Sequence, residues 1–141
     1  MSYASHEPEF SAEKIAESID GQPAPTDQQR KVIEAKLEPQ LVVAGAGAGK
    51  TETMAARAVF LVANGWVSTD QILGLTFTRK AAGELNARIR HRLNQLADSG
   101  LIPSNDPRMK TIRDSQQTVV TYDSLWSVSA FLLNRSSDLR P

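Results

Sequence analysis

The chain has 141 residues, of which 40% are hydrophobic, and it contains no cysteine. This length suits one domain with a buried core, and the lack of cysteine excludes disulfides and thiolate metal sites. No apolar run approaches the roughly 18 residues of a membrane-spanning helix, and the first residues lack the basic and apolar regions of a secretory signal. We therefore expect a cytoplasmic protein without a membrane partner.

The formal net charge is zero, but the charges are unevenly distributed. Residues 1–40 carry eight acidic side chains against four basic ones, whereas residues 79–113 carry eight basic side chains against three acidic ones. A basic segment of this kind can bind the phosphate backbone of a nucleic acid, although it is more often the solvated face of a helix. Charge alone leaves both interpretations open.

The first 25 residues look peripheral, and their pattern predicts one short helix over residues 11–19. The glycine and prolines of residues 21–25 end this helix. A second helix is expected from Thr26 to about Leu37, where a proline follows.

Thr26 and Gln29 have the spacing of a capping box, in which each side chain accepts a hydrogen bond from the other residue's backbone. The alternative role of Gln29 is to read a base edge of a nucleotide, because an amide donates and accepts at once, as adenine requires. The local sequence does not decide between these roles, and one rotamer can hardly serve both.

Residues 41–43 form a short apolar run with two valines, which predicts a buried strand. The next eight residues, Ala44 to Thr51, alternate alanine with glycine and close on Gly-Lys-Thr before a helical pattern. Strand, small-residue loop and helix N-terminus is the order of a phosphate-binding loop. Lys50 would reach the β- and γ-phosphates, and the Thr51 hydroxyl would bind Mg²⁺. A small-residue turn without function is the less favoured alternative.

A helix is expected over residues 50–64, with Met54 among the side chains that face the core. Gly65 is well placed to end this helix. A second apolar strand follows at residues 72–77, and Thr78 is a suitable N-cap for the helix after it.

That next helix has an apolar stripe at helical spacing, with Arg88 and Arg92 expected on the opposite side. Residues 100–106 read as a loop, residues 118–122 as a third strand, and residues 125–132 as part of a last helix. Strands that alternate with helices predict an α/β fold, in which a parallel sheet is flanked by helical crossovers.

Three separated segments resemble motifs of the superfamily 1A DNA helicases, the group that contains UvrD, Rep, PcrA and RecB/AdnB. Residues 25–30 resemble its Q motif, residues 44–51 its motif I and residues 75–85 its motif Ia, whose Thr-Phe-Thr-basic-Lys-Ala-Ala run is the most specific part. A weaker match at residues 121–125 has Asp123 where the family usually has histidine. The resemblance implies a P-loop NTPase fold, here an incomplete RecA-like lobe that corresponds to the first helicase lobe, 1A.

The resemblance also implies roles for individual residues, with ATP and Mg²⁺ as cofactors. Lys50 would be the catalytic residue and Thr51 the Mg²⁺ ligand. The implied ATP contacts are Gln29 at the adenine, Arg30 beside the nucleotide, and Ala44, Gly45, Ala46, Gly47, Ala48, Gly49, Lys50, Thr51 and Glu52. The implied contacts to single-stranded DNA are Thr76, Phe77, Thr78, Arg79, Thr121 and Tyr122. Glu52 stands where the family often has arginine, and a core side chain is the alternative for Phe77.

No Asp-Glu pair follows a later apolar strand, so the acidic motif that holds Mg²⁺ and activates water is absent from this sequence. The second helicase lobe, with the arginines that it gives to the γ-phosphate, is absent as well. We therefore expect an N-terminal piece of a larger motor. It would comprise an acidic extension at residues 1–24, part of the ATP-binding domain at residues 25–134 and a polar tail at residues 135–141.

The resulting hypothesis is a parent protein that is an ATP-dependent 3′-to-5′ DNA helicase in repair or recombination, or the helicase subunit of a complex with a nuclease partner. The chain alone should bind nucleotide weakly and hydrolyse none. One alternative is a stand-alone nucleotide-binding module. A small P-loop kinase is disfavoured, because it would need an arginine-rich lid after the third strand.

Overall fold

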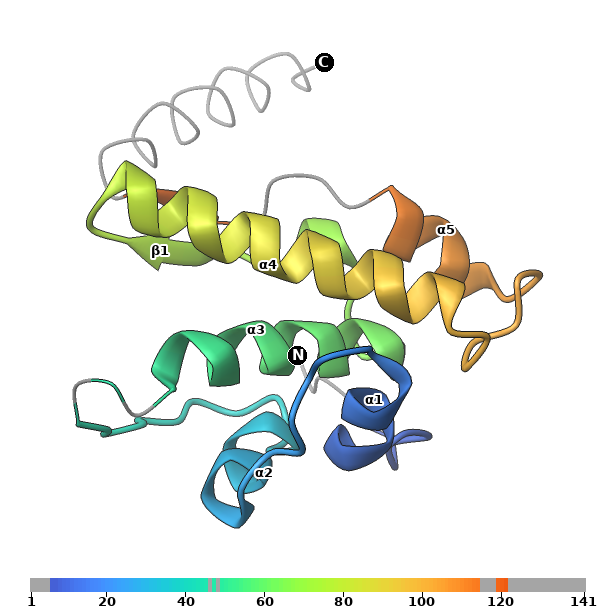
Figure 1. Ribbon diagram of the computed structural model, residues 1–141, viewed down its shortest axis with the longest axis horizontal. Coiled ribbons are helices and arrows are strands. Elements are labelled where there is room, and N and C mark those ends of the chain that lie inside the picture. Colours follow the sequence, from blue (N-terminus) through green and yellow to red (C-terminus); the bar gives the residue numbers. More distant parts are fainter. Residues whose placement is uncertain (1–5, 46, 48, 115–118, 122–141) are drawn as a thin grey trace, which may run out of the picture.

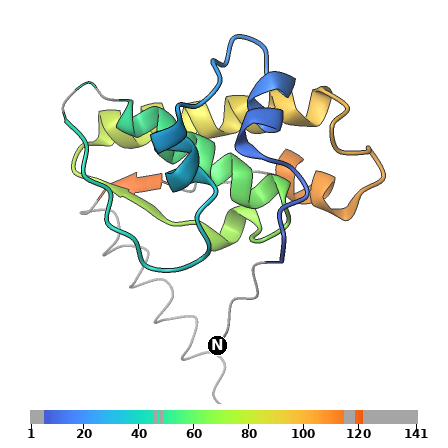
Figure 2. The ribbon, with the colours of Figure 1, turned by 90° about the horizontal axis from the view of Figure 1, so that it is seen from below.

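The structure is a computed structural model that describes residues 6–45, 47, 49–114 and 119–121. Its elements are α1 (Ala12–Ser18), α2 (Asp27–Ile33), α3 (Lys50–Ala63), the 3₁₀-helix η1 (Thr69–Gln71), β1 (Gly74–Thr76), α4 (Arg79–Asp98), α5 (Pro107–Arg113) and β2 (Val119–Thr121). Helix α3 is central, with α1 and α2 on one side and α4 and α5 on the other (Figure 1). A second view places the loop before α3 and the start of α4 at the same end of the molecule (Figure 2).

Helix α1 begins where expected, because the Ser11 side chain accepts a hydrogen bond from the Lys14 backbone N–H at 3.1 Å. The helix buries Ile15, and Ile19 just beyond its end is buried as well. Both side chains belong to the core shared with α3 and α4, so the expected peripheral position of this segment is wrong. The domain boundary at residue 24 stays a prediction.

Helix α2 ends at Ile33, earlier than the expected Leu37, because Arg57 of α3 binds the backbone that follows. The Arg57 guanidinium donates to the carbonyl oxygens of Ile33 at 2.8 Å and Lys36 at 3.1 Å, and also to that of Ala35. A side chain from another helix thus satisfies carbonyl groups that further helical turns would have used. The same contacts fix α2 against α3.

Helix α3 ends in a Schellman motif, as the glycine after Asn64 predicted. The backbone N–H of Trp66 donates to the Leu61 carbonyl at 3.0 Å, and that of Gly65 donates to the Val62 carbonyl at 3.0 Å. Gly65 has φ +67°, a left-handed conformation that favours glycine. The inward side of the helix differs from the prediction, since Met54 is half exposed while Thr53 is buried.

The strand prediction for residues 41–43 is wrong, whereas the later strands are confirmed in shortened form. β1 and β2 pair in parallel, with Gly74 opposite Val119 and Thr76 opposite Thr121. Among the described residues these two strands form the whole sheet, so residues 41–43 have no ladder partner there. An isolated extended segment lacks the interstrand hydrogen bonds that make it a strand, and Leu41 and Val43 are 91% and 88% exposed. The predicted helix at residues 125–132 lies outside the described residues.

Helix α4 buries the predicted apolar stripe of Ala82, Leu85, Ile89, Leu93 and Leu96. Helix α5 lies within the region that follows the expected loop, and sequence reasoning missed it. Its signals were an N-cap acid followed by proline, with apolar residues three apart on the inner face. No helix in the part of the chain that the structure describes is long and apolar enough to cross a bilayer.

Candidate functional site

The loop from residue 44 to residue 49 leads directly into α3, as the phosphate-loop pattern predicted. Gly47 and Gly49 both have φ +75°, which residues with side chains rarely adopt. Gly49 is the N-cap of α3 and offers no side chain to the first turn. The first backbone N–H groups of a helix have no partner within it, and here they lie beside small residues at the positive end of the helix dipole. Ala46 and Ala48 lie outside the described residues.

Gln29 connects α2 to this loop. Its Oε1 accepts a hydrogen bond from the Thr26 backbone N–H at 3.0 Å, and its own N–H donates to Thr26 Oγ1 at 3.3 Å. The capping box is therefore confirmed. The other end of the amide lies at the loop, because a Cβ added to Gly49 would stand 3.0 Å from Gln29 Nε2. The side chain thus caps one helix and closely approaches the N-cap glycine of another.

Three further residues of the predicted ATP set lie on α2 and at the start of α3. Lys50 and Thr51 form the start of α3, and both are exposed. Arg30, on α2, pairs with Asp27 at 3.2 Å, and the Arg30 side chain is about half exposed. An exposed ion pair of this kind is weak, so it leaves Arg30 available to other partners.

Glu52, in the first turn of α3, joins this helix to α4. One carboxylate oxygen pairs with Arg88 and the other pairs with Arg92. Arg92 also donates to the backbone carbonyl of Glu52 at 3.2 Å. The side chain of Arg92 is only 10% exposed, so the expected solvated position of this arginine is wrong. A buried arginine needs a paired acceptor, which Glu52 supplies. These three residues are called the Glu52 clamp below.

The predicted DNA segment follows β1 at the same end of the molecule (Figures 1 and 2). Phe77 is 92% exposed, so its alternative reading as a core side chain is wrong. Thr78 caps α4, because its Oγ1 accepts a hydrogen bond from the Ala81 N–H at 3.1 Å. Thr76 donates its hydroxyl to the Thr78 carbonyl at 3.0 Å. Arg79 is exposed in the first turn of α4.

The sheet register brings the two predicted DNA segments together. The backbone of Thr76 at the end of β1 lies opposite that of Thr121 at the end of β2, and the strands run parallel. Ligands of open α/β sheets bind at the carboxyl ends of parallel strands, which is where both segments lie. Tyr122, the remaining member of the set, lies outside the described residues.

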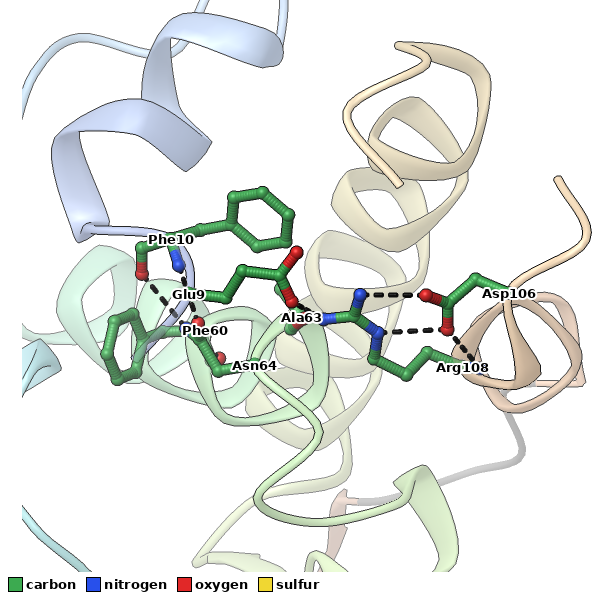
Figure 3. A network of polar contacts seen from close by, with 7 residues as sticks. All are labelled: Glu9, Phe10, Phe60, Ala63, Asn64, Asp106 and Arg108. Atoms are coloured by element: carbon green, nitrogen blue, oxygen red, sulfur yellow. Dashed lines mark hydrogen bonds and ion pairs between the residues drawn. The ribbon is translucent and has the colours of Figure 1, made fainter. Parts of the chain in front are cut away.

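A second polar cluster lies at the opposite end of α3 and was not found from the sequence (Figure 3). Arg108 of α5 donates to Asp106 at 2.8 Å, to Glu9 at 2.8 Å and to the Ala63 carbonyl at 2.8 Å. Hydrogen bonds from Arg108 lower the pKa of Asp106 to about 2, and the carboxylates raise that of Arg108. Since this cluster joins segments far apart in the sequence, local patterns could not reveal it.

The residues around the loop fit a nucleotide phosphate with a magnesium ion. A Cβ added to Gly47 would meet no described atom within 4 Å, so the space beside this glycine is open. In the described ranges no group of three or more acidic or histidine side chains could hold a metal by itself. A metal here would therefore depend on the Thr51 hydroxyl together with phosphate oxygens and water.

Comparison with known families gives one matching description, the UvrD/REP helicase N-terminal domain, over residues 25–131. The match includes both α2 and the loop before α3, and it extends beyond β2.

Individual relatives match shorter parts of the chain. ATP-dependent DNA helicase UvrD2 of Mycobacterium tuberculosis H37Rv is 50% identical over 64 residues, which are 45% of this chain and 9% of the relative. DNA helicase IV of Escherichia coli K12 is 46% identical over 76 residues, or 54% of this chain and 11% of the relative. DNA helicase II of Haemophilus influenzae is 40% identical over 87 residues, which are 62% of this chain and 12% of the relative. The matched regions thus span about a tenth of these relatives.

Proposed function

The chain belongs to the UvrD/REP helicase N-terminal domain family, and from this premise we propose that it is the ATP-binding portion of an ATP-dependent 3′-to-5′ DNA helicase. Its matched relatives are named as DNA helicases. The proposed parent acts in DNA repair or recombination, in the cytoplasm, either alone or as the helicase subunit of a complex with a nuclease partner. Residues 25–134 form the ATP-binding part, and residues 1–24 and 135–141 flank it.

The observation that carries this proposal is the position of Gln29 beside Gly49. A base-reading residue must lie within reach of the phosphate loop, and this amide approaches the loop where α3 begins. The capping box does not exclude base recognition, because the Gln29 carbonyl oxygen has two lone pairs and the cap uses one. Oε1 can therefore accept a second hydrogen bond while Nε2 donates, which is the combination that adenine needs. One rotamer of Gln29 can therefore cap α2 and recognise the base at the same time, although the sequence alone suggested that these roles exclude each other.

The phosphates of ATP would lie in the loop formed by residues 44–51. The Lys50 ammonium would contact the β- and γ-phosphates, and the open N–H groups of the first turn would donate to their oxygens. Thr51 would hold Mg²⁺, which neutralises phosphate charge when it is bound. Arg30 would approach the nucleotide from α2. The Glu52 side chain would contribute through its pairing with α4 and not through a direct contact with ATP, because both of its carboxylate oxygens are engaged.

Single-stranded DNA would cross the carboxyl ends of β1 and β2. The exposed ring of Phe77 offers a stacking surface for a base, and Arg79 offers a charge to the backbone. Thr76, Thr78 and Thr121 would contribute backbone or hydroxyl contacts beside them, with Tyr122 as a further contact. Turnover would need the acidic motif and a second helicase lobe, so the chain alone should bind nucleotide without hydrolysing it.

The test is a titration of the chain with fluorescent ADP and GDP analogues in the presence of Mg²⁺. We expect ADP to bind more tightly than GDP, and Gln29→Ala to remove this preference while weak phosphate-dependent binding remains. Gln28→Ala is the matched control, because Gln28 is the exposed neighbour outside the capping box. Equal affinity for the two nucleotides, or no binding of either, would contradict the proposal for this chain. Hydrolysis that depends on Lys50 would contradict the expected lack of turnover.

A further inference from the structure

The Glu52 clamp links the two halves of the candidate site. Glu52 directly follows Thr51 at the phosphate loop, while α4, which carries Arg88 and Arg92, begins immediately after the exposed Phe77 segment. From Arg92 back to Arg79 the helix is continuous and spans about 20 Å at 1.5 Å per residue. One rigid element thus connects the loop to the proposed DNA surface.

The geometry of the clamp fixes the relative position of the two helices along their axes. Apolar contacts between α3 and α4 hold the helices together, but such contacts have little directionality. The clamp is directional, because each carboxylate oxygen pairs with a different arginine and these arginines are one helical turn apart. The bond from Arg92 to the Glu52 carbonyl adds a backbone contact in the same turn. A shift of α4 along its axis would separate at least one of these arginines from Glu52.

We propose that Glu52 is a positioning residue, which transmits the state of the phosphate loop through Arg88 and Arg92 to residues 76–80. This inference rests on the proposed function for the identity of the two ligands. Binding of phosphate moves the first turn of α3, the clamp carries that movement to α4, and the start of α4 changes its position relative to DNA. Affinity for nucleotide and affinity for DNA are then linked, each raising the other by the same factor.

Charge gives the proposal a signature that a merely structural role lacks. Glu52 carries a negative charge next to the site of the phosphates, and it lowers nucleotide affinity by electrostatic repulsion. Replacing it with the uncharged Gln keeps the shape and the acceptor oxygen while leaving both arginines positive. Glu52→Gln should therefore bind nucleotide about two- to fivefold more tightly in the absence of DNA. A variant that only loosened the fold would bind nucleotide less tightly.

The main experiment measures the affinity of the chain for a fluorescent ADP analogue with Mg²⁺, with and without a saturating oligo-dT strand. In the unchanged chain we expect oligo-dT to raise this affinity by about fivefold or more, and a decrease would contradict the proposal. In Glu52→Gln and in Arg88→Ala the factor should fall toward one. Arg90→Ala is the charge control, because Arg90 is an exposed arginine of α4 outside the clamp. Asn64→Ala is the stability control, because Asn64 lies at the other end of α3. In both control variants, oligo-dT should change the affinity for the ADP analogue by the same factor as in the unchanged chain.

Hydrogen exchange gives a readout that needs neither ligand. Glu52→Gln should speed exchange of the backbone amides in residues 76–82, as well as in the first turn of α3, whereas Arg90→Ala should not. A change confined to the first turn of α3, or an unaltered coupling factor in Glu52→Gln, would overturn the proposal. If the unchanged chain binds neither ADP nor oligo-dT, the proposed function fails for this chain. In that case, the hydrogen exchange of residues 76–82 in Glu52→Gln alone tests whether the clamp connects α3 to the start of α4.

Discussion

Asn64 holds both backbone groups of Phe10 through the two ends of its side-chain amide (Figure 3). The Phe10 N–H donates to Asn64 Oδ1 at 2.8 Å, and Asn64 Nδ2 donates to the Phe10 carbonyl at 3.0 Å. The same Nδ2 donates to the Phe60 carbonyl at 3.0 Å. The C-cap residue of α3 therefore pairs with the N-terminal segment much as a strand partner would, and it fixes where α1 begins.

Replacing Asn64 with Ala should lower the free energy of unfolding by about 2 to 3 kcal/mol, because a partly buried N–H and carbonyl of Phe10 lose their partners. Urea unfolding followed by circular dichroism measures this change. Asn94→Ala is the matched control, since Asn94 is exposed on α4 and should change stability little. A loss for Asn64→Ala no larger than that for the control would show that the N-terminal segment is not held by this amide.

The Asp106–Arg108 pair predicts a specific pH dependence of stability. In the folded chain the pKa of Asp106 is lowered from 3.8 to about 2 by the hydrogen bonds from Arg108. A lowered folded-state pKa means that the stabilisation is complete above the unfolded pKa and is lost as the pH falls from about 4 to about 2. Asp106→Asn removes the charge but keeps an N-cap side chain for α5.

We therefore expect Asp106→Asn to be less stable than the unchanged chain at pH 7, and the difference to shrink through that acidic range. Urea midpoints at a series of pH values measure the difference. Glu84→Gln is the control, because Glu84 is an exposed acid of α4. A difference independent of pH would mean that the charge of Asp106 does not stabilise the fold.

Gly47 and Gly49 allow backbone strain to be separated from contact with Gln29. Both have φ +75°, so alanine at either position costs about 1 to 2 kcal/mol in backbone energy. Only at Gly49 would the new Cβ also meet Gln29 Nε2, at 3.0 Å. We expect Gly49→Ala to lose more stability than Gly47→Ala, and Gln29→Ala to recover part of that extra loss in the double variant. Equal losses, measured by thermal unfolding, would place Gln29 away from the loop in solution.

Arg57 should determine how firmly α2 is held against α3. Arg57→Lys keeps a positive charge but cannot reach three carbonyl groups with the planar geometry of a guanidinium, so stability should fall by about 1 to 2 kcal/mol. Burial also lowers the pKa of Arg57, which shows that its charge is partly removed from water. Hydrogen exchange should quicken at residues 27–37, and Arg90→Ala should leave those amides unaffected. Unchanged exchange there would mean that apolar packing alone holds α2.

Local signals in the sequence predicted the helical part of the fold well. The Thr26 and Thr78 caps, the Gly65 stop and the apolar stripe of α4 each depend on residues within one or two turns, and each is confirmed. The strand at residues 41–43 failed because a strand depends on a partner that local sequence does not specify. The predicted end of α2 was wrong for a related reason, because the helix ends where Arg57, a residue of another helix, binds its backbone.

The sequence predicted the position of the small-residue loop, but it did not predict the ion pairs that join the start of α3 to α4. The glycine pattern predicted a small-residue loop that leads into a helix, because phosphate binding requires small residues at fixed spacing. The structure has that loop and helix, and phosphate binding there stays a prediction. The Glu52 clamp joins residues 36 and 40 positions apart, and only the folded chain brings them together. Family resemblance placed Glu52 at the nucleotide, whereas its carboxylate is committed to two arginines of α4.

The exposed apolar side chains around the loop and β1 affect how this chain behaves in concentrated solution. Leu41, Val43 and Phe77 are all about nine-tenths exposed. Exposed apolar side chains favour contact between copies. With a formal net charge of zero at pH 7, long-range repulsion between the copies is weak. Colloidal stability should therefore be lowest near neutral pH and should improve when acid or base gives the chain a net charge.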